Sequence, residues 1–371
     1  MSDPNVNVVA RLRGIGLKPS LIQQLPSIEL LDTDSTLMRV CEVQRASLTL
    51  HDGVTLWPAR QLPSLRADLT DIGDTIAVGD WVQVGRDDFG GCWAQRRLVP
   101  FNQLARRLHQ EGRDKVARAV IVSNVDTALL VMGLDHDYNL RRLERYAVLV
   151  RLAGVAAVVV LTKADLCADP AARLADLRAT LPDLPAISLD ATRPDAAELL
   201  TTQLGPWLSR DADGTSPTLV MLGSSGAGKS TLTNALLGSQ RQSTGANRED
   251  DSRGRHTTTA RSLHLTPTGA CIIDTPGLRT LRLDGDAEHL GAVFDDVARL
   301  ALSCRFRDCR HEAEPGCAVR AGVSAERLHN FHKLQREARR DTKSALERKA
   351  EVAQWKSRHR EARERLQDKR G

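Results

Sequence analysis

The sequence of 371 residues has few aromatic residues, no long apolar run and no paired set of cysteines. Phenylalanine, tryptophan and tyrosine together make up 3% of it, which argues against recognition of nucleic-acid bases mainly by stacking. No apolar stretch approaches the roughly 20 residues of a membrane-spanning helix. No charged leader followed by an apolar segment opens the chain. We therefore expect a cytoplasmic protein with no membrane partner.

The seven cysteines do not indicate a disulfide framework, because their number is odd and four of them stand alone. The other three lie within residues 304–317 and, with one histidine, form the pattern C-x4-C-x-H-x5-C. Three thiolates and an imidazole are a typical closed tetrahedral zinc shell, which suits a structural ion. The sequence therefore predicts one Zn²⁺; free cytosolic thiols are the alternative. The predicted ligands are Cys304, Cys309, His311 and Cys317.

The basic charge is concentrated at one end of the chain. The whole sequence has 52 Lys and Arg against 47 Asp and Glu, whereas residues 333–371 have 14 against 7. Such a tail indicates a polyanionic partner such as RNA. An alternative interpretation, equally compatible with the sequence, is a solvated helix of mixed charge.

Stretches rich in the turn-forming residues Gly, Pro and Asp, together with changes in sequence pattern, divide the chain into four parts. Residues 1–36 are expected to be an N-terminal arm, and 37–105, with several short alternating strands, a five-stranded β-barrel of the oligonucleotide-binding (OB) type. A small β-domain acting only as a spacer is the alternative for the barrel. In 106–285, apolar strands alternate with helices, which is typical of an α/β nucleotide-binding domain with a parallel sheet. Residues 286–371 form the predicted metal-binding module and a basic helical tail.

The stretch GSSGAGKST, residues 223–231, follows an apolar strand and precedes a helical segment. It fits the phosphate-binding pattern G-x-x-x-x-G-K-S, in which glycines let backbone N–H groups face the phosphates. The lysine, Lys229, can reach the β and γ oxygens, and the hydroxyl of Ser230 can bind Mg²⁺. This pattern alone leaves kinases and ATPases open. The predicted phosphate-side residues are Gly223, Ser224, Ser225, Gly226, Ala227, Gly228, Lys229, Ser230 and Thr231.

Two further motifs narrow the choice of nucleotide. In DTPG, Asp274 ends an apolar strand and can contact the Mg²⁺ shell through water, while the N–H of Gly277 can meet the γ-phosphate. In TKAD, the carboxylate of Asp165 can accept from both N1–H and N2–H of guanine, a donor pair that adenine lacks. The stem of Lys163 would pack on the base. Thr162 stands where most GTPases have asparagine, which predicts guanine specificity with weaker affinity.

In the order TKAD, GSSGAGKS, GRHTTT (254–259), DTPG and the cysteine cluster, the chain resembles the circularly permuted GTPases of ribosome biogenesis, specifically the bacterial family of ribosome small subunit-dependent GTPase A. In an ordinary GTPase the phosphate loop comes first. Permutation still leaves each motif at the carboxyl end of its own strand, so the loops can meet at one edge of the sheet.

The resemblance also assigns roles within GRHTTT. It implies Thr258 as a second Mg²⁺ ligand and His256 as the group that orients the attacking water. Leu278, which follows DTPG, stands where many GTPases have a glutamine for that water, and leucine cannot hydrogen-bond it. A surface histidine in a flexible loop is the alternative for His256.

We therefore expect a monomeric multidomain GTPase that converts GTP to GDP and phosphate. The resemblance implies that it acts on the small (30S) ribosomal subunit and its rRNA during late maturation. A P-loop kinase or ATPase with no RNA role, and a GTP-dependent RNA-binding scaffold, remain the alternatives.

Overall fold

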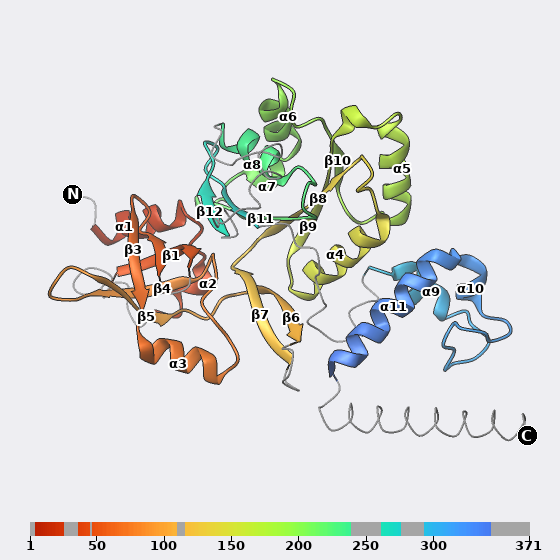
Figure 1. The fold of residues 1–371 in the computed structure, drawn as a ribbon, viewed down its shortest axis with the longest axis horizontal. Coiled ribbons are helices and arrows are strands. Elements are labelled where there is room, and N and C mark those ends of the chain that lie inside the picture. The colour runs from red at the N-terminus through yellow and green to blue at the C-terminus, as the bar shows by residue number, and fades with distance from the viewer. Residues whose placement is uncertain are drawn as a thin grey trace, which may run out of the picture. The chain divides into compact units, whose positions relative to one another are not determined.

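The protein is described by a computed structural model at residues 4–25, 36–44, 47–109, 116–238, 261–275 and 293–342 (Figure 1). Its contacts divide the chain into two compact units. The first unit comprises residues 1–106 and 118–281, and the second comprises 107–117 and 282–371.

The first unit contains a closed five-stranded barrel. Its strands pair in the order β1-β2-β3-β5-β4, and β4 pairs back onto β1. This number of strands and one helix between the third and fourth strands agree with an OB-type barrel. Alternate residues such as Met38, Val40, Leu50 and Val82 point inward and form its core. The elements are β1 (Thr36–Val43), β2 (Leu48–His51), β3 (Leu56–Gln61), α3 (Pro63–Asp71), β4 (Trp81–Arg86) and β5 (Cys92–Arg97).

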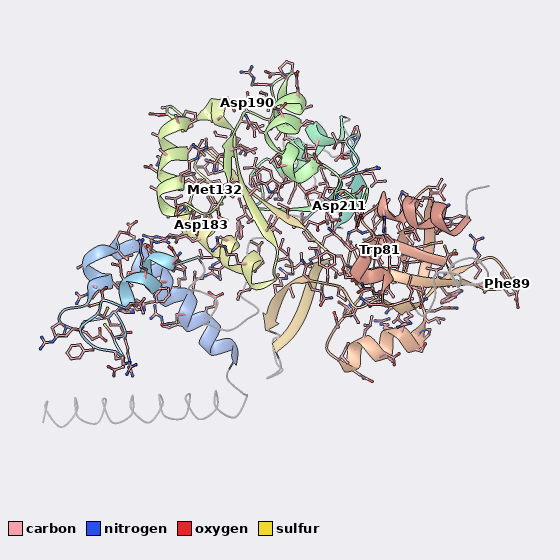
Figure 2. The ribbon with its side chains drawn as sticks, turned by 180° about the vertical axis from the view of Figure 1, so that it is seen from behind. Trp81, Phe89, Met132, Asp183, Asp190 and Asp211 are labelled. Carbon is pink, nitrogen blue, oxygen red and sulfur yellow. The ribbon has the colours of Figure 1, made fainter. Side chains whose placement is uncertain are left out.

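Two tryptophans of the barrel close its hairpin turns. The indole N–H of Trp57 donates to Asp52 at 2.9 Å, and that of Trp93 donates to Asp87 at 2.7 Å. The second turn presents Phe89 at the outer end of the hairpin, away from the buried Trp81, as Figure 2 shows. These indoles therefore stabilise turns of the fold.

The N-terminal segment, expected to be an arm, contains two helices in its described part. They are α1 (Pro4–Arg13) and α2 (Pro19–Ile22). Leu12, Ile15, Leu17 and Leu21 are buried in a cluster with Trp81 of the barrel. Leu12 lies in α1, Ile15 and Leu17 lie in the turn that follows, and Leu21 lies in α2, so both helices and the turn contribute to this cluster. Pro19 is tolerated because it stands in the first turn of α2.

An α/β sheet continues from the barrel in the same unit. Its strands lie in the order β10-β9-β8-β11-β13-β12, and all are parallel except β12. Strand β12 pairs with β1 of the barrel, so the strands of the barrel and those of the α/β part form one continuous 11-stranded sheet. The strands are β8 (Thr127–Gly133), β9 (Ala156–Thr162), β10 (Ala186–Ser188), β11 (Thr218–Leu222), β12 (Ser262–Leu265) and β13 (Cys271–Asp274).

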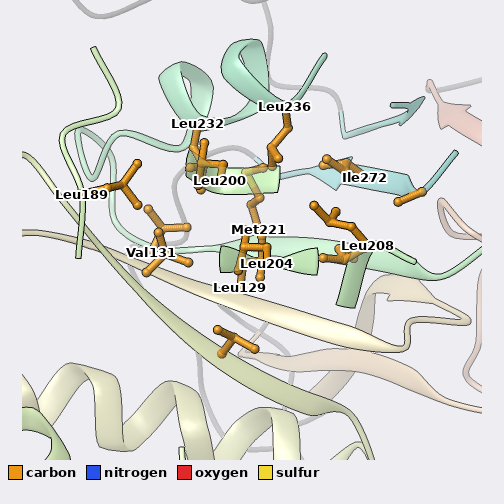
Figure 3. Close-up of a cluster of buried hydrophobic side chains, with 14 of the residues drawn as sticks. Leu129, Val131, Leu189, Leu200, Leu204, Leu208, Met221, Leu232, Leu236 and Ile272 are labelled. Carbon is orange, nitrogen blue, oxygen red and sulfur yellow. The ribbon is translucent and has the colours of Figure 1, made fainter. Parts of the chain in front are cut away.

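Helices cover both faces of this sheet. Leucines of α6, α7 and α8 pack with Leu129, Val131 and Met221 of the strands on one face (Figure 3). Helix α4 packs against β8 and β9, and α5 against β10. The strands are buried on both sides, which explains their nearly continuous apolar sequence. The helices are α4 (Leu140–Leu152), α5 (Pro170–Thr180), α6 (Ala196–Gln203), α7 (Gly205–Leu208) and α8 (Lys229–Leu237); a short 3₁₀ helix, η2, spans Ala164–Leu166.

A buried arginine connects the barrel to the rest of the first unit. The guanidinium of Arg39, on β1, donates to the carbonyl oxygens of Ile15 and Asn124, and it lies 5.6 Å from the Trp81 ring centroid. A buried charge needs such partners, since an unpaired one costs several kcal/mol. Arg39 therefore helps to hold the barrel on the sheet.

The second unit is helical in its described C-terminal part. The rings of Phe294 and Phe331 meet edge-on at 5.4 Å, and Arg327 pairs with Asp296 at 2.6 Å. No described helix is both long and apolar enough to cross a bilayer. The helices are α9 (Asp295–Ala301), α10 (Ala318–Gly322) and α11 (Ala325–Thr342); the boundary between the units runs through the paired strands β6 (Gln103–His109) and β7 (Val116–Ser123).

Candidate functional site

The predicted phosphate loop, residues 223–228, connects β11 to α8. Gly226 and Gly228 have φ of 82° and 88°, the left-handed region that favours glycine. A Cβ at Gly223 would lie 2.3 Å from the carbonyl oxygen of Val131. The glycines are therefore required by the backbone of the loop as well as by access to a phosphate.

The side chain of Lys229 folds under this loop. It is buried, and its Nζ donates to the carbonyl oxygens of Gly223 at 3.0 Å and Ser224 at 2.6 Å. Ser230 and Thr231 follow in the first turn of α8 and are half-buried. The N-terminus of α8 thus presents N–H groups, a cation and two hydroxyls at one point, an arrangement suited to an anionic ligand.

The predicted base loop, residues 162–166, follows β9 and contacts the phosphate loop. The hydroxyl of Thr162 donates to the carbonyl oxygen of Ala227 at 2.7 Å. Threonine therefore makes a link to the phosphate loop although it is shorter than asparagine. Lys163 has the left-handed φ of 57°, and Asp165 is exposed. Its carboxylate is accessible to a ligand.

The third predicted loop begins at the end of β13, which lies next to β11. Asp274 ends this strand and is half-buried. The hydroxyl of Thr275 donates to the carbonyl oxygen of Met221 at 2.5 Å and so links the start of DTPG to β11. Gly277 and Leu278 lie outside the described residues, as do His256 and Thr258.

Residues that the sequence analysis missed lie in the loop after β8, residues 134–139, here called the acidic loop. Asp135 pairs with Lys163 Nζ at 2.6 Å, and Asp137 accepts from the hydroxyl of Ser224. Burial opposes the charged form of Asp135, but the hydrogen bonds from Lys163 and from the N–H of Asp137 outweigh it, so the pKa of Asp135 is lowered. Two aspartates directly after a buried strand were the available signal.

The predicted metal ligands of the second unit come together. One ligand atom from each of Cys304, Cys309, His311 and Cys317 lies within 4.8 Å of all the others. Cys304 Sγ is 3.9 Å from Cys317 Sγ, and His311 Nδ1 is 3.6 and 3.5 Å from these two sulfurs. These four residues therefore form a candidate metal site.

Neighbouring groups affect the loop between the four residues and the protonation of His311. The side chain of Glu314 accepts N–H bonds from Arg310, Glu312 and Ala313, which lowers its pKa to about 2 and connects three N–H groups of the loop between the ligands. Burial, and then the neighbouring His332, lower the pKa of His311. A neutral imidazole is the form that binds metal ions.

Comparisons with known proteins agree with this arrangement. A sequence profile of the family described as RsgA GTPase matches residues 101–284. The small ribosomal subunit biogenesis GTPase RsgA of Xylella fastidiosa (strain M23) is 47% identical over 271 residues, which are 71% of this chain and 76% of that protein. The small ribosomal subunit biogenesis GTPase RsgA 2 of Vibrio parahaemolyticus is 38% identical over 351 residues, covering 93% of this chain and 90% of the relative.

Solved structures confirm the predicted fold class. YjeQ from Thermotoga maritima matches with a TM-score of 0.56 at 22% identity, covering 82% of this chain and 98% of its own. YloQ, titled a circularly permuted GTPase, matches with a TM-score of 0.54 at 21% identity over 84% and 97%. An OB-type barrel, a permuted P-loop domain and a C-terminal Cys/His module therefore describe this chain.

Proposed function

We propose a function for this chain on the premise that it belongs to the RsgA GTPase family. It is then an enzyme that hydrolyses GTP to GDP and phosphate. The observation that best supports this is the hydrogen bond between Thr162 and the carbonyl oxygen of Ala227, 65 positions apart in sequence. It links a loop suited to guanine and a loop suited to phosphate, as one bound nucleotide requires.

The roles of the site residues are part of the proposal. Lys229 would hold the β and γ oxygens, and Asp165 would accept from guanine N1–H and N2–H. Ser230 and Thr258 would hold Mg²⁺, with Asp274 contacting its shell; the bound ion would supply neutralisation of phosphate charge. Ser230 fits this role because its hydroxyl lies in the first turn of α8, next to the phosphate loop. His256 would orient the attacking water.

We further propose that the metal of the cysteine cluster is one structural Zn²⁺. With Zn–S bonds of about 2.3 Å and a Zn–N bond of about 2.05 Å, a tetrahedral ion would hold two sulfurs about 3.8 Å apart and a sulfur and a nitrogen about 3.6 Å apart. The separations of 3.9, 3.6 and 3.5 Å between Cys304, Cys317 and His311 agree with this shell. Four protein ligands leave no open position, so the ion would stabilise the module.

The partner proposed is the small (30S) ribosomal subunit, whose late maturation the enzyme would assist. The names of the relatives support this, since they are called small ribosomal subunit biogenesis GTPases. The basic composition of 333–371 supports contact with rRNA. The chain would act as a monomer in the cytoplasm, with the domain boundaries at 36, 105 and 285 predicted from the sequence.

The test is hydrolysis of GTP and of ATP, each alone and with purified small or large ribosomal subunits. We expect hydrolysis of GTP only, slow for the isolated chain and accelerated by small subunits. Acceleration should require His256, so His256→Ala should keep binding of GTP and subunits but lose most of the acceleration. Hydrolysis of ATP at an equal rate would favour a kinase or ATPase, and GTP hydrolysis unchanged by either subunit would favour a GTP-dependent scaffold.

A further inference from the structure

The acidic loop lies between the two nucleotide-binding loops. Strand β8, which it follows, pairs with β9 on one side and with β11 on the other. The base loop follows β9 and the phosphate loop follows β11, and all three strands are parallel. Parallel strands end at the same edge of a sheet, so residues 134–139 can contact both loops at once.

The first aspartate of the acidic loop contacts the base loop. Asp135 Oδ2 is 2.6 Å from Lys163 Nζ, and the side chain of Asp135 is 11% exposed. The N–H of Asp137 donates to Asp135 Oδ1 at 3.0 Å, which fixes the orientation of the carboxylate. A Cβ at Gly133 would lie 2.7 Å from that same oxygen and 3.3 Å from Lys163 Cδ. Glycine at position 133 therefore leaves the space in which the pair forms.

The second aspartate contacts the phosphate loop. Asp137 Oδ2 accepts from the hydroxyl of Ser224, while Oδ1 pairs with Arg142 at 2.7 Å. Arg142 also donates to the carbonyl oxygen of Asp137. Asn139 caps helix α4 by accepting from the N–H of Arg142 at 3.1 Å. Through these bonds the N-terminus of α4 holds the acidic loop in place.

A free carboxylate near a polyphosphate would weaken binding through like-charge repulsion. In this loop each carboxylate is paired with a cation, Asp135 with Lys163 and Asp137 with Arg142. The geometry thus suits orientation of the neighbouring loops better than direct contact with a nucleotide. Neither aspartate belongs to the TKAD, GSSGAGKS or DTPG motif.

We propose that the acidic loop is a positioning element for both halves of the nucleotide site. Asp135 sets the orientation of Lys163, whose stem packs on the base, and Asp137 sets the position of Ser224 in the phosphate loop. The inference rests on the base and phosphate loops proposed above. It identifies Asp135 and Asp137 as positioning residues for nucleotide binding.

Four double-mutant cycles on the full chain test this inference, with dissociation constants for GDP as the measurement. Asp135→Ala and Asp137→Ala should each weaken GDP binding about tenfold, as expected for loss of a charge-assisted bond. Asp135→Ala should be non-additive with Lys163→Ala and additive with Ser224→Ala. For Asp137→Ala the pattern should be reversed. General destabilisation would not produce this crosswise pattern.

Conservative variants and a matched control complete the experiment. Asp137→Asn keeps an acceptor for the Ser224 hydroxyl and should recover part of the affinity lost in Asp137→Ala. Gly133→Ala should weaken binding without removing any charge. The control is Asp183→Asn, because Asp183 also forms an ion pair, with Arg151. Asp183 precedes β10 and so lies at the opposite end of that strand from Asp190 (Figure 2).

Two results would contradict the inference. If the chain binds GDP, and the cycles Asp135/Lys163 and Asp137/Ser224 are additive or the single variants stay within twofold of Asp183→Asn, the inference alone is wrong. If the unaltered chain binds no guanine nucleotide, the proposed function fails and the inference fails with it. Should Asp137→Ala not fold, Asp137→Asn takes its place in the two Asp137 cycles, and the Asp135 cycles with Gly133→Ala test the other half of the inference by the same affinities.

Discussion

The nucleotide site and the cysteine cluster obtain their order in different ways. The nucleotide loops lie at the edge of a sheet with a large buried core, and hydrogen bonds of the chain itself join them. By contrast, within residues 302–318, all of which the structure describes, only Cys317 is buried. A segment with so little apolar core cannot offset its conformational entropy by burial.

This difference predicts opposite responses to the loss of a ligand. The nucleotide loops should keep their arrangement without nucleotide, because Lys229, Thr162 and Thr275 are already hydrogen-bonded within the protein. The cysteine segment should lose its arrangement without metal, because binding of the proposed ion would supply its folding energy.

The largest expected effect is that of Cys309→Ala on the second unit. Removal of one of four ligands should abolish tight zinc binding, from about one ion per chain to none, since structural sites need a full shell. Residues 302–318 should then become accessible to proteases. Metal analysis of protein purified without added zinc, with limited proteolysis, measures both effects. Cys167→Ala, a lone cysteine in the first unit, is the control, and retention of the ion in Cys309→Ala would contradict the assignment.

The next effect is that of Lys229→Ala on the first unit. It removes the cation of the phosphate loop and also the donor to the carbonyl oxygens of Gly223 and Ser224. We expect GTP binding or hydrolysis to fall at least about 100-fold, with or without ribosomal subunits. Zinc content should stay unchanged, because the cysteine cluster obtains its order independently of the nucleotide site. Titration with a fluorescent nucleotide and metal analysis of the same sample measure the loss of nucleotide binding and the retained zinc.

A smaller change of the same site is Asp165→Asn, which should alter the choice of base. The amide oxygen can still accept from guanine N1–H, but the amide NH2 group presents a donor where the carboxylate accepts from N2–H, so GTP affinity should fall by up to about 100-fold. Xanthosine triphosphate has a carbonyl oxygen, an acceptor, at that position. It should therefore bind to Asp165→Asn better than to the parent. Competition titrations of the two nucleotides provide the measurement. Unchanged GTP affinity would show that TKAD does not read the base.

Asp80→Asn should have the smallest effect on nucleotide or metal binding. It should change only the pH dependence of the free energy of unfolding. Burial raises the pKa of Asp80 to about 6, although Arg97 and the N–H of Ala77 favour the charged form. Since an unfolded aspartate titrates at about 3.9, Asp80 stabilises the folded state most below that pH, and this contribution is lost as the pH rises through 6.

Asparagine does not titrate, so the free energy of unfolding of the parent relative to Asp80→Asn should fall by about 3 kcal/mol at most between pH 4 and pH 7. Urea unfolding at both pH values measures this difference, and GDP affinity should be unaffected. A difference that grows with pH would contradict the sign.

Sequence alone could predict the features that depend on local spacing. The phosphate loop was predictable because Gly226 and Gly228 must adopt positive φ between a strand and a helix. The cysteine cluster was predictable because its ligands lie within 14 positions of one another, Cys304 to Cys317. In both cases the neighbours in space are neighbours in sequence.

Features that depend on distant contacts could not be predicted. The bond between Asp137 and Ser224 joins residues 87 positions apart, and nothing in the spacing of either indicates the other. The helices of residues 4–25 were missed because their leucines become informative only once Trp81 is known to cover them. Likewise, the link from Thr162 to Ala227 requires the spatial order of the strands, β9-β8-β11, which their order along the chain does not give.

We propose that hydrogen bonds of the chain itself form the nucleotide site, whereas a bound metal ion forms the cysteine site. The most direct test is to remove zinc from the unaltered protein with a chelator, and then to measure GDP affinity and hydrogen exchange of residues 302–318 in the same sample. We expect fast exchange across 302–318 and a GDP dissociation constant within about twofold of that of the untreated protein. Protection of 302–318 without metal, or loss of GDP binding together with the ion, would contradict it.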